Sequence, residues 1–128
     1  MDTTSEERIL SAVSHLGLFF HLPGLFVALL IYLFKRESSA FVAQHALQAI
    51  GFQVVMMLLG GVFGFGAMGL VFGGLIMGGA AGVVGVAVFL WFTVVLLALC
   101  AAVGIYRAML GKDFTYPLIG EFVNRIGR

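Results

Sequence analysis

The chain has 128 residues, of which 62% are hydrophobic and 10% are charged, and its formal net charge is +1. A soluble domain has about 25% charged residues and could not bury so much apolar surface, so this composition excludes an ordinary soluble fold. The small net charge also argues against nucleic acid as a partner, because nucleic-acid binding needs a basic surface.

The distribution of charge predicts an integral membrane protein. No Asp, Glu, Lys or Arg occurs in the 69 residues between Glu37 and Arg107. One charge at the centre of a membrane helix raises the insertion free energy by roughly 2.5–3.5 kcal/mol, so a gap of this length is typical of a bilayer environment. We predict a single all-α membrane domain over residues 1–128, with three transmembrane helices and further amphipathic helices at the interface.

The first segment opens with a capping box. Thr4 and Glu7 have the spacing at which each side chain satisfies a free backbone amide of the other at a helix start. The residues that follow separate into a polar and an apolar side, which is typical of a helix lying at the membrane interface. Pro23 and Gly24 then interrupt the apolar run, because proline lacks an amide donor and clashes with the preceding turn.

Two arrangements fit this first apolar segment. Residues 16–34 form a run of 19 residues. As a helix this run is about 28 Å long, which just spans the hydrocarbon core. Alternatively, the chain enters the membrane, turns at Pro23-Gly24 and leaves on the same side as a re-entrant hairpin. We favour the single span, kinked at Pro23-Gly24.

A polar stripe follows on the next predicted helix, which begins near Ser38 and continues into a second span over residues 47–70. At 100° per residue, its members share one side: Phe41, Gln44, His45, Gln48 and Phe52. Unpaired amides and imidazoles cost several kcal/mol in hydrocarbon, so we expect this face to meet protein, within the chain or in a partner. It either forms helix-to-helix hydrogen bonds or lines a groove or pore mouth.

Glycine is concentrated after this stripe, with 11 of the 18 glycines lying between Gly60 and Gly85. Gly74, Gly78 and Gly82 repeat at the four-residue spacing that lets membrane helices approach closely. We expect helix packing at these three glycines, and self-association is one form of it. A hairpin turn near residues 72–79 is the alternative interpretation.

The third predicted span covers residues 83–105 and ends at Tyr106-Arg107, an aromatic and basic boundary. Pro117 suits the first position of a helix, and residues 117–126 form an amphipathic pattern. Three spans place six basic residues on one side and Arg8 alone on the other. The positive-inside rule then predicts a multi-pass protein of the cell membrane, in bacteria the inner membrane, with a cytoplasmic C-terminus. A re-entrant first segment would place all seven inside.

The residues that could carry chemistry are few. His15 and His21 are six residues apart, about 240° around a helix, so they do not share a metal as neighbours one turn apart would. The membrane segments contain no acidic residue for a Ser/His/acid set. We therefore predict no catalytic residue, no metal site and no cofactor. A haem held between His45 and either His15 or His21 is an alternative.

The run from Ser39 to Gln53, SAFVAQHALQAIGFQ, follows a short basic loop. Together with the Pro23-Gly24 break and the ending YPLIG, which starts at Tyr116, it resembles a bacterial family of small membrane proteins of unassigned function. That family is distantly similar to the twenty-kilodalton membrane component of the chloroplast inner-envelope protein import translocon. The resemblance implies a helical membrane protein in or beside a multi-subunit assembly, and no catalytic residues.

These observations give three functional hypotheses. The first is a non-catalytic structural or accessory subunit of a membrane assembly, with protein translocation as its more specific form. The second is a small oligomeric channel or transporter, with Gln44, His45 and Gln48 lining its mouth. The third is a haem or quinone subunit of an electron-transfer complex. The expected partners are the lipid bilayer and other membrane subunits or a second copy, without nucleic acid.

Overall fold

The computed structural model describes residues 3–77, 80–117 and 120–126, and it confirms the all-α fold class. The elements are α1 (Ser5–Leu16), the short 3-10 helix η1 (Gly17–Phe20), α2 (His21–Lys35), α3 (Ala40–Met77), α4 (Ala80–Met109) and α5 (Gly120–Ile126). Three stretches are long and apolar enough to cross a membrane: Ser5–Lys35, Ala40–Gly61 and Gly82–Met109. The predicted second and third spans fall within α3 and α4, and the predicted C-terminal helix begins at Gly120 rather than Pro117.

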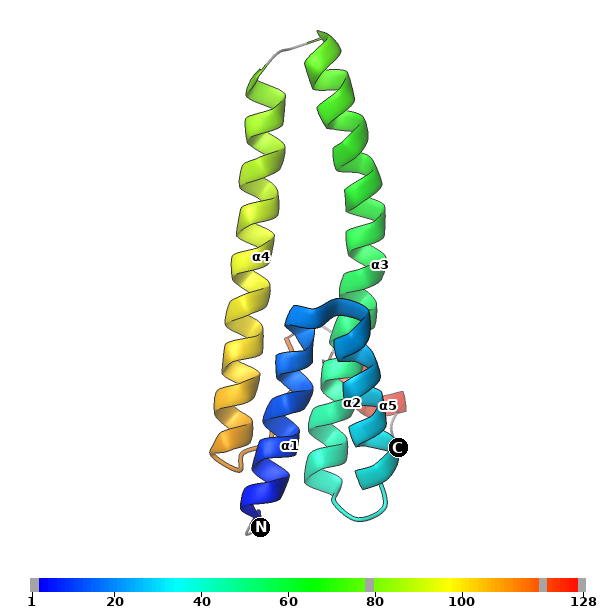
Figure 1. Ribbon diagram of the computed structural model, residues 1–128, viewed down its shortest axis with the longest axis vertical. Helices are drawn as coiled ribbons and strands as arrows, with labels where there is room; N and C mark the ends of the chain where they lie inside the picture. The colour runs from blue at the N-terminus through cyan, green and yellow to red at the C-terminus, as the bar shows by residue number, and fades with distance from the viewer. Residues whose placement is uncertain (1–2, 78–79, 118–119, 127–128) are drawn as a thin grey trace.

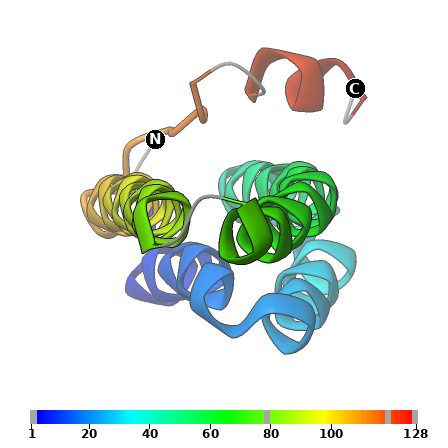
Figure 2. The same ribbon diagram turned by 90° about the horizontal axis from the view of Figure 1, so that it is seen from above.

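The helices form three layers, which are separate in the view from above (Figure 2). The α1–α2 pair lies on one face of the α3–α4 pair, and the C-terminal segment with α5 lies on the opposite face. Helices α3 and α4 have 38 and 30 residues and extend far beyond α1 and α2 (Figure 1). At 1.5 Å per residue, α3 is about 57 Å long, so its length exceeds the ~30 Å hydrocarbon core.

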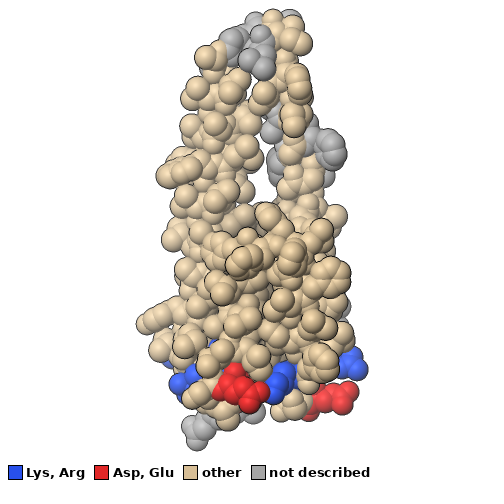
Figure 3. Space-filling view, viewed as in Figure 1, with Lys and Arg blue, Asp and Glu red and all other residues tan. Residues whose placement is uncertain are grey.

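Charged side chains gather at one end of the molecule, while the far legs of α3 and α4 show no charged side chain among their described residues on this face (Figure 3). The start of α1, the α2–α3 connection and the end of α4 all lie at this charged end (Figure 1). Because charges are costly in hydrocarbon, this end meets water or lipid headgroups and the legs lie in the bilayer. Arg8 also lies at this end, because its side chain is next to Gly111, just after α4.

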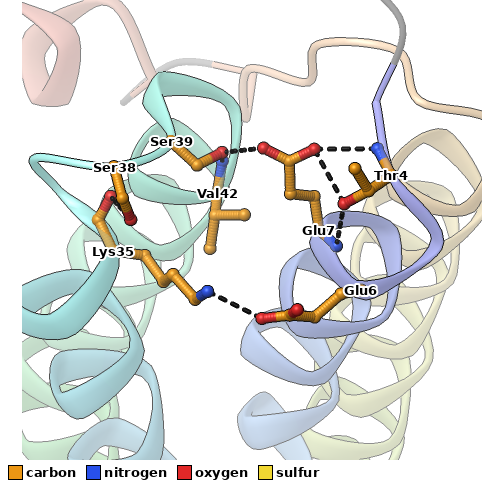
Figure 4. Close-up of polar contacts among 7 residues, drawn as sticks. All are labelled: Thr4, Glu6, Glu7, Lys35, Ser38, Ser39 and Val42. Carbon is orange, nitrogen blue, oxygen red and sulfur yellow. Dashed lines mark hydrogen bonds and ion pairs between the residues drawn. The ribbon is translucent and has the colours of Figure 1, made fainter.

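The first segment is a helical hairpin, so the single kinked span that we favoured from the sequence is corrected. Helices α1 and α2 run in opposite directions, and both outer ends lie at the charged end (Figure 1). Figure 4 shows the contacts that hold these ends: Lys35 Nζ donates to Glu6 Oε1 at 2.6 Å, and Ser39 Oγ donates to Glu7 Oε1 at 2.6 Å. The predicted Thr4–Glu7 capping box is present.

The physical reason for the correction is where the chain turns. The reversal falls at η1 and His21, whose φ of 49° is a left-handed value, and Pro23 instead occupies the first turn of α2. Proline is tolerated there because the first amides of a helix have no intrahelical acceptor. The two legs have 12 and 15 residues, about 18 and 23 Å, so neither crosses the hydrocarbon core alone.

Two contacts close the turn of the hairpin. The backbones of Gly17 and Gly24 lie against each other so closely that a Cβ on Gly24 would overlap the Gly17 carbonyl. From α3, Gln53 Nε2 donates to the Gly17 carbonyl at 2.7 Å and to the His21 carbonyl at 3.3 Å. Carbonyls at a helix end need a partner wherever water is excluded, so Gln53 allows the turn to lie at membrane depth.

Two of the three glycines predicted to pack together lie in different helices. Gly74 lies in α3, Gly82 lies in α4, and Gly78 lies outside the described residues. Helices α3 and α4 run in opposite directions, so Gly74 and Gly82 do not share one helix stripe, and the predicted packing stays a prediction. Elsewhere on the legs, a Cβ added at Gly64, or at Gly85, would meet no atom within 4 Å.

Candidate functional site

A buried polar network lies near the charged end, where the three layers meet. His15 of α1 and His45 of α3 are both 0% exposed, and Tyr116 of the C-terminal segment is 1% exposed. His15 contacts both His45 and Tyr116, so its imidazole joins the hairpin layer to the C-terminal layer across the α3–α4 pair. We use the name C-terminal strap for the described residues 111–117 and 120–126.

The hydrogen bonds of this network run in one direction. His45 Nε2 lies 3.1 Å from the Lys112 carbonyl, which can only accept, so His45 carries its proton on Nε2 and donates there. The Nδ1 atom of a neutral His45 therefore accepts, and His15 Nε2 donates to it at 2.9 Å. His15 Nδ1 in turn accepts from the Tyr116 hydroxyl at 2.9 Å. Each imidazole is thus assigned as the neutral Nε2–H tautomer by its partners.

Helix α4 makes room for the His15 ring at Gly104. A Cβ at this position would come within 2.8 Å of His15 Nδ1 and 2.9 Å of its Cγ, which is closer than real Cβ atoms approach. Gly104 is buried, although the rest of α4 is largely exposed. The absence of a side chain at Gly104 is therefore what lets His15 reach Tyr116.

Gln48 fastens the strap at a second place. Its Nε2 donates to the Gly120 carbonyl at 2.9 Å, and its Oε1 accepts from the Tyr116 amide at 3.1 Å. The Tyr116 ring stacks on Phe52 of α3, with ring centroids 4.1 Å apart and an interplanar angle of 9°. Val123 of α5 packs on Gly51, where a Cβ would overlap its side chain. Polar and apolar contacts together hold the strap on α3.

The predicted stripe of α3 is mostly covered by the chain itself. Phe41, His45, Gln48 and Phe52 are buried, between 0 and 8% exposed. His45 contacts both the hairpin and the strap, and Gln48 and Phe52 contact the strap. Gln44 differs, because it is half-buried and lines a cavity of about 280 Å³ together with Thr3 and Asp113. A role for this stripe in binding a partner stays a prediction.

Three residues of the site have no part in the predicted stripe. His15 and Tyr116 are 101 residues apart in the sequence, and no periodic pattern connects positions so distant. Gln53 lies off the stripe and serves the hairpin turn instead. An amide in the middle of an apolar helix is itself a signal, because such a group needs a partner. The sequence does not show that the partners of Gln53 are backbone carbonyls.

The site is built for hydrogen bonding rather than for holding an ion. Burial raises the pKa of the Tyr116 hydroxyl well above its ordinary value, so this group remains a donor. Each imidazole nitrogen of His15 and His45 is used within the network, so in this arrangement the two do not act together as axial ligands of a haem iron. Within the described ranges, no group of three or more His, Cys, Asp or Glu residues could hold a metal ion.

These features define a small helical membrane protein with one polar, internally fastened end. The chain belongs to the MamF/MmsF family, described as the magnetosome magnetite crystal formation protein family, whose model matches residues 6–123. No curated protein and no solved structure matches the chain. The family is one of bacterial membrane proteins, as the resemblance implied, and together with the three apolar stretches it supports a multi-pass membrane location. It suggests a non-catalytic, membrane-associated accessory protein.

Proposed function

We propose that the protein is a non-catalytic accessory subunit of a membrane assembly, held in the bilayer by α3 and α4 and bound to its partners through the charged end. The observation that carries this proposal is the concentration of polar groups. The charged side chains seen in Figure 3 gather at one end, the histidine–tyrosine network and the strap lie in the same half of the molecule, and the long legs of α3 and α4 make up the rest (Figures 1 and 3). A protein with apolar legs and one charged end is suited to be anchored in the bilayer by the legs and to bind a partner at the charged end.

We further propose that this assembly takes part in magnetite crystal formation. The family description supports this step, because the matched residues 6–123 include the hairpin, both long helices and most of the strap. In a host that forms such crystals, deletion of the gene should change crystal size or number in electron micrographs, and reintroduction should restore them. Unchanged crystals would contradict this role while leaving the docking proposal standing.

Native mass spectrometry in gentle detergent tests the docking proposal. A single copy bound to a different membrane subunit would support it. The side chains of Arg36 and Glu37 are exposed at the charged end, so Arg36→Glu with Glu37→Lys should release the partner without unfolding the protein. Met68→Leu on the exposed leg of α3 is the matched control and should retain the partner. Equal retention by both variants would place the interface elsewhere.

The other hypotheses are separated by the same preparation. A closed homo-oligomer would favour the channel alternative, in which Gln44 would lie at the mouth. A visible absorption band in the purified protein would favour the haem subunit, and a co-purified quinone the quinone subunit. Cross-linking of the charged end to a polypeptide in transit would favour the translocation form of the accessory role.

A further inference from the structure

We propose that the His15–His45 pair is a pH-sensitive latch, which holds the C-terminal strap on the bundle at neutral pH and releases it in acid. The latch joins three separate parts of the chain, namely α1, α3 and the strap. It does not depend on which partner the protein binds, so it stands apart from the proposed function.

Two of the hydrogen bonds that anchor the strap end on this pair. The Lys112 carbonyl accepts from His45, and the Tyr116 hydroxyl donates to His15. Two more, at the Tyr116 amide and the Gly120 carbonyl, end on Gln48, and the amides of Gly111 and Lys112 donate to α4 where the strap leaves that helix. Lys112, Asp113 and Thr115 are exposed, so the outer side of the strap already faces solvent, and release would uncover Phe114 and Tyr116 on its inner side.

A first proton on the pair reverses the direction of the hydrogen bonds in the network. If His45 becomes protonated, its Nδ1–H must donate to His15 Nε2, and His15 must move its own proton to Nδ1. His15 Nδ1–H then donates to the Tyr116 oxygen, so the tyrosine hydroxyl no longer has His15 as its acceptor. Tyr116 is 1% exposed, and a buried donor without an acceptor costs about 1–3 kcal/mol.

A second proton cannot be accommodated in the closed arrangement. Two imidazolium rings would point N–H groups at each other across the 2.9 Å that separates His15 Nε2 from His45 Nδ1. Both rings are 0% exposed, so neither charge would be hydrated. Opening the strap removes this conflict because it admits water to both rings, and proton uptake is therefore coupled to release.

Few charged or titratable groups surround the pair. Asp113 of the strap acts on His45, Tyr116 of the strap adjoins His15, and Cys100 of α4 adjoins Tyr116. From α4, the group against the His15 ring is Gly104, which carries no charge. Among the described residues, Asp113 is therefore the one anion acting on the pair, and it is itself exposed, so solvent screens its charge.

Hydrogen–deuterium exchange of the full chain in lipid nanodiscs tests the latch. The reporters are the backbone amides of the strap, above all the Tyr116 amide, which donates to Gln48 of α3. Below the pH at which the pair titrates, their protection factors should fall about 10- to 100-fold per pH unit, because opening takes up one to two protons. The amides of α2 and α3 should keep their protection over this range.

Matched variants identify the residues responsible. His15→Gln with His45→Gln should remove the acid-dependent loss of strap protection, whereas His21→Gln, which changes the exposed third histidine, should retain it. Nitrogen chemical shifts of the wild-type imidazoles provide a test that needs no variant, since both rings should be Nε2–H tautomers at neutral pH. Strap protection that does not change between neutral and acidic pH, or that is lost together with the protection of α2 and α3, would overturn the proposal.

Discussion

Gly17 and Gly24 lie backbone against backbone at the closed end of the α1–α2 hairpin, with no space for a side chain at either position. The contact joins the first residue of the turn to the first turn of α2. It lets two short helices reverse direction within five residues and still pack along each other. The hairpin therefore depends on the absence of a side chain at these two positions.

Gly24→Ala should destabilise the protein. The added Cβ would overlap the Gly17 carbonyl, and backbone atoms give way less easily than a flexible side chain, so we expect a loss of about 1–3 kcal/mol. Thermal unfolding in detergent measures this change. Gly64→Ala is the control, because its Cβ meets nothing within 4 Å, and it should gain up to about 1 kcal/mol of helix propensity. Equal effects would mean that the hairpin is not closed by this contact.

Gln53→Leu should open the hairpin turn. The change leaves the Gly17 and His21 carbonyls without the Gln53 amide, and each buried group left unpaired costs about 1–3 kcal/mol. Exchange of the backbone amides in η1 and the start of α2 should therefore speed up. Gln44→Leu, at a half-buried amide of the same helix, should leave these amides protected. A hairpin that exchanges identically in both variants would show that Gln53 is dispensable.

Gly104→Leu should separate the strap from α1. A side chain at Gly104 would displace the His15 ring and break its bond to the Tyr116 hydroxyl. We expect a loss of about 2 kcal/mol or more, as for overpacking of a tight site, together with faster exchange of the strap amides. Gly85→Leu on the same helix has open space around it and should be tolerated. If Gly104→Leu is equally well tolerated, the His15 ring does not pack against α4 at this position.

The protonated Tyr116 hydroxyl should contribute to the stability of the fold at neutral pH, and this contribution should be lost in strongly alkaline solution. Burial raises its pKa in the folded state above the ordinary value of 10.0. Its contribution is therefore complete below pH 10 and declines as the pH rises above that value, since the unfolded chain loses the proton first. Tyrosinate absorbance should show one component that appears only with unfolding. In Tyr116→Phe this component should be missing; if it persists, another tyrosine is the buried one.

Reporter fusions should place both ends of the chain on one side of the membrane. The hairpin returns α2 to the charged end, and α3 and α4 make two crossings, so N-terminal and C-terminal reporters should agree. The positive-inside rule predicts that this side is the cytoplasm. A reporter inserted between Met77 and Ala80 should read the opposite side. An N-terminal reporter that disagrees with the C-terminal one would restore the single kinked span.

Charge and hydropathy were sufficient to predict α3 and α4, because the bilayer imposes a long apolar run on any helix that crosses it. They could not decide the first segment. A run of 19 apolar residues has the same composition whether it crosses once or folds back. The choice rests on a contact between Gly17 and Gly24 and on an amide of α3, both of which exist only in three dimensions.

The candidate site shows the same division between local and distant information. The period of Phe41, His45, Gln48 and Phe52 marked a face that had to meet protein, and these four side chains are indeed buried. The sequence could not show which residues cover this face, because His15 precedes it and Tyr116 follows it at long distances along the chain. No helical period or spacing rule connects positions on separate elements.

The separation of 101 residues between His15 and Tyr116 also sets an order of events during synthesis. The ribosome makes α1 early, yet the hydroxyl that satisfies its buried imidazole arrives only after both long helices have been made. Until then the hairpin carries an incomplete hydrogen-bonding surface at the membrane face. The lifetime of this intermediate is set by the rate of elongation rather than by the folding rate of the hairpin. A chaperone or insertase that shields the surface would bind the chain during that time.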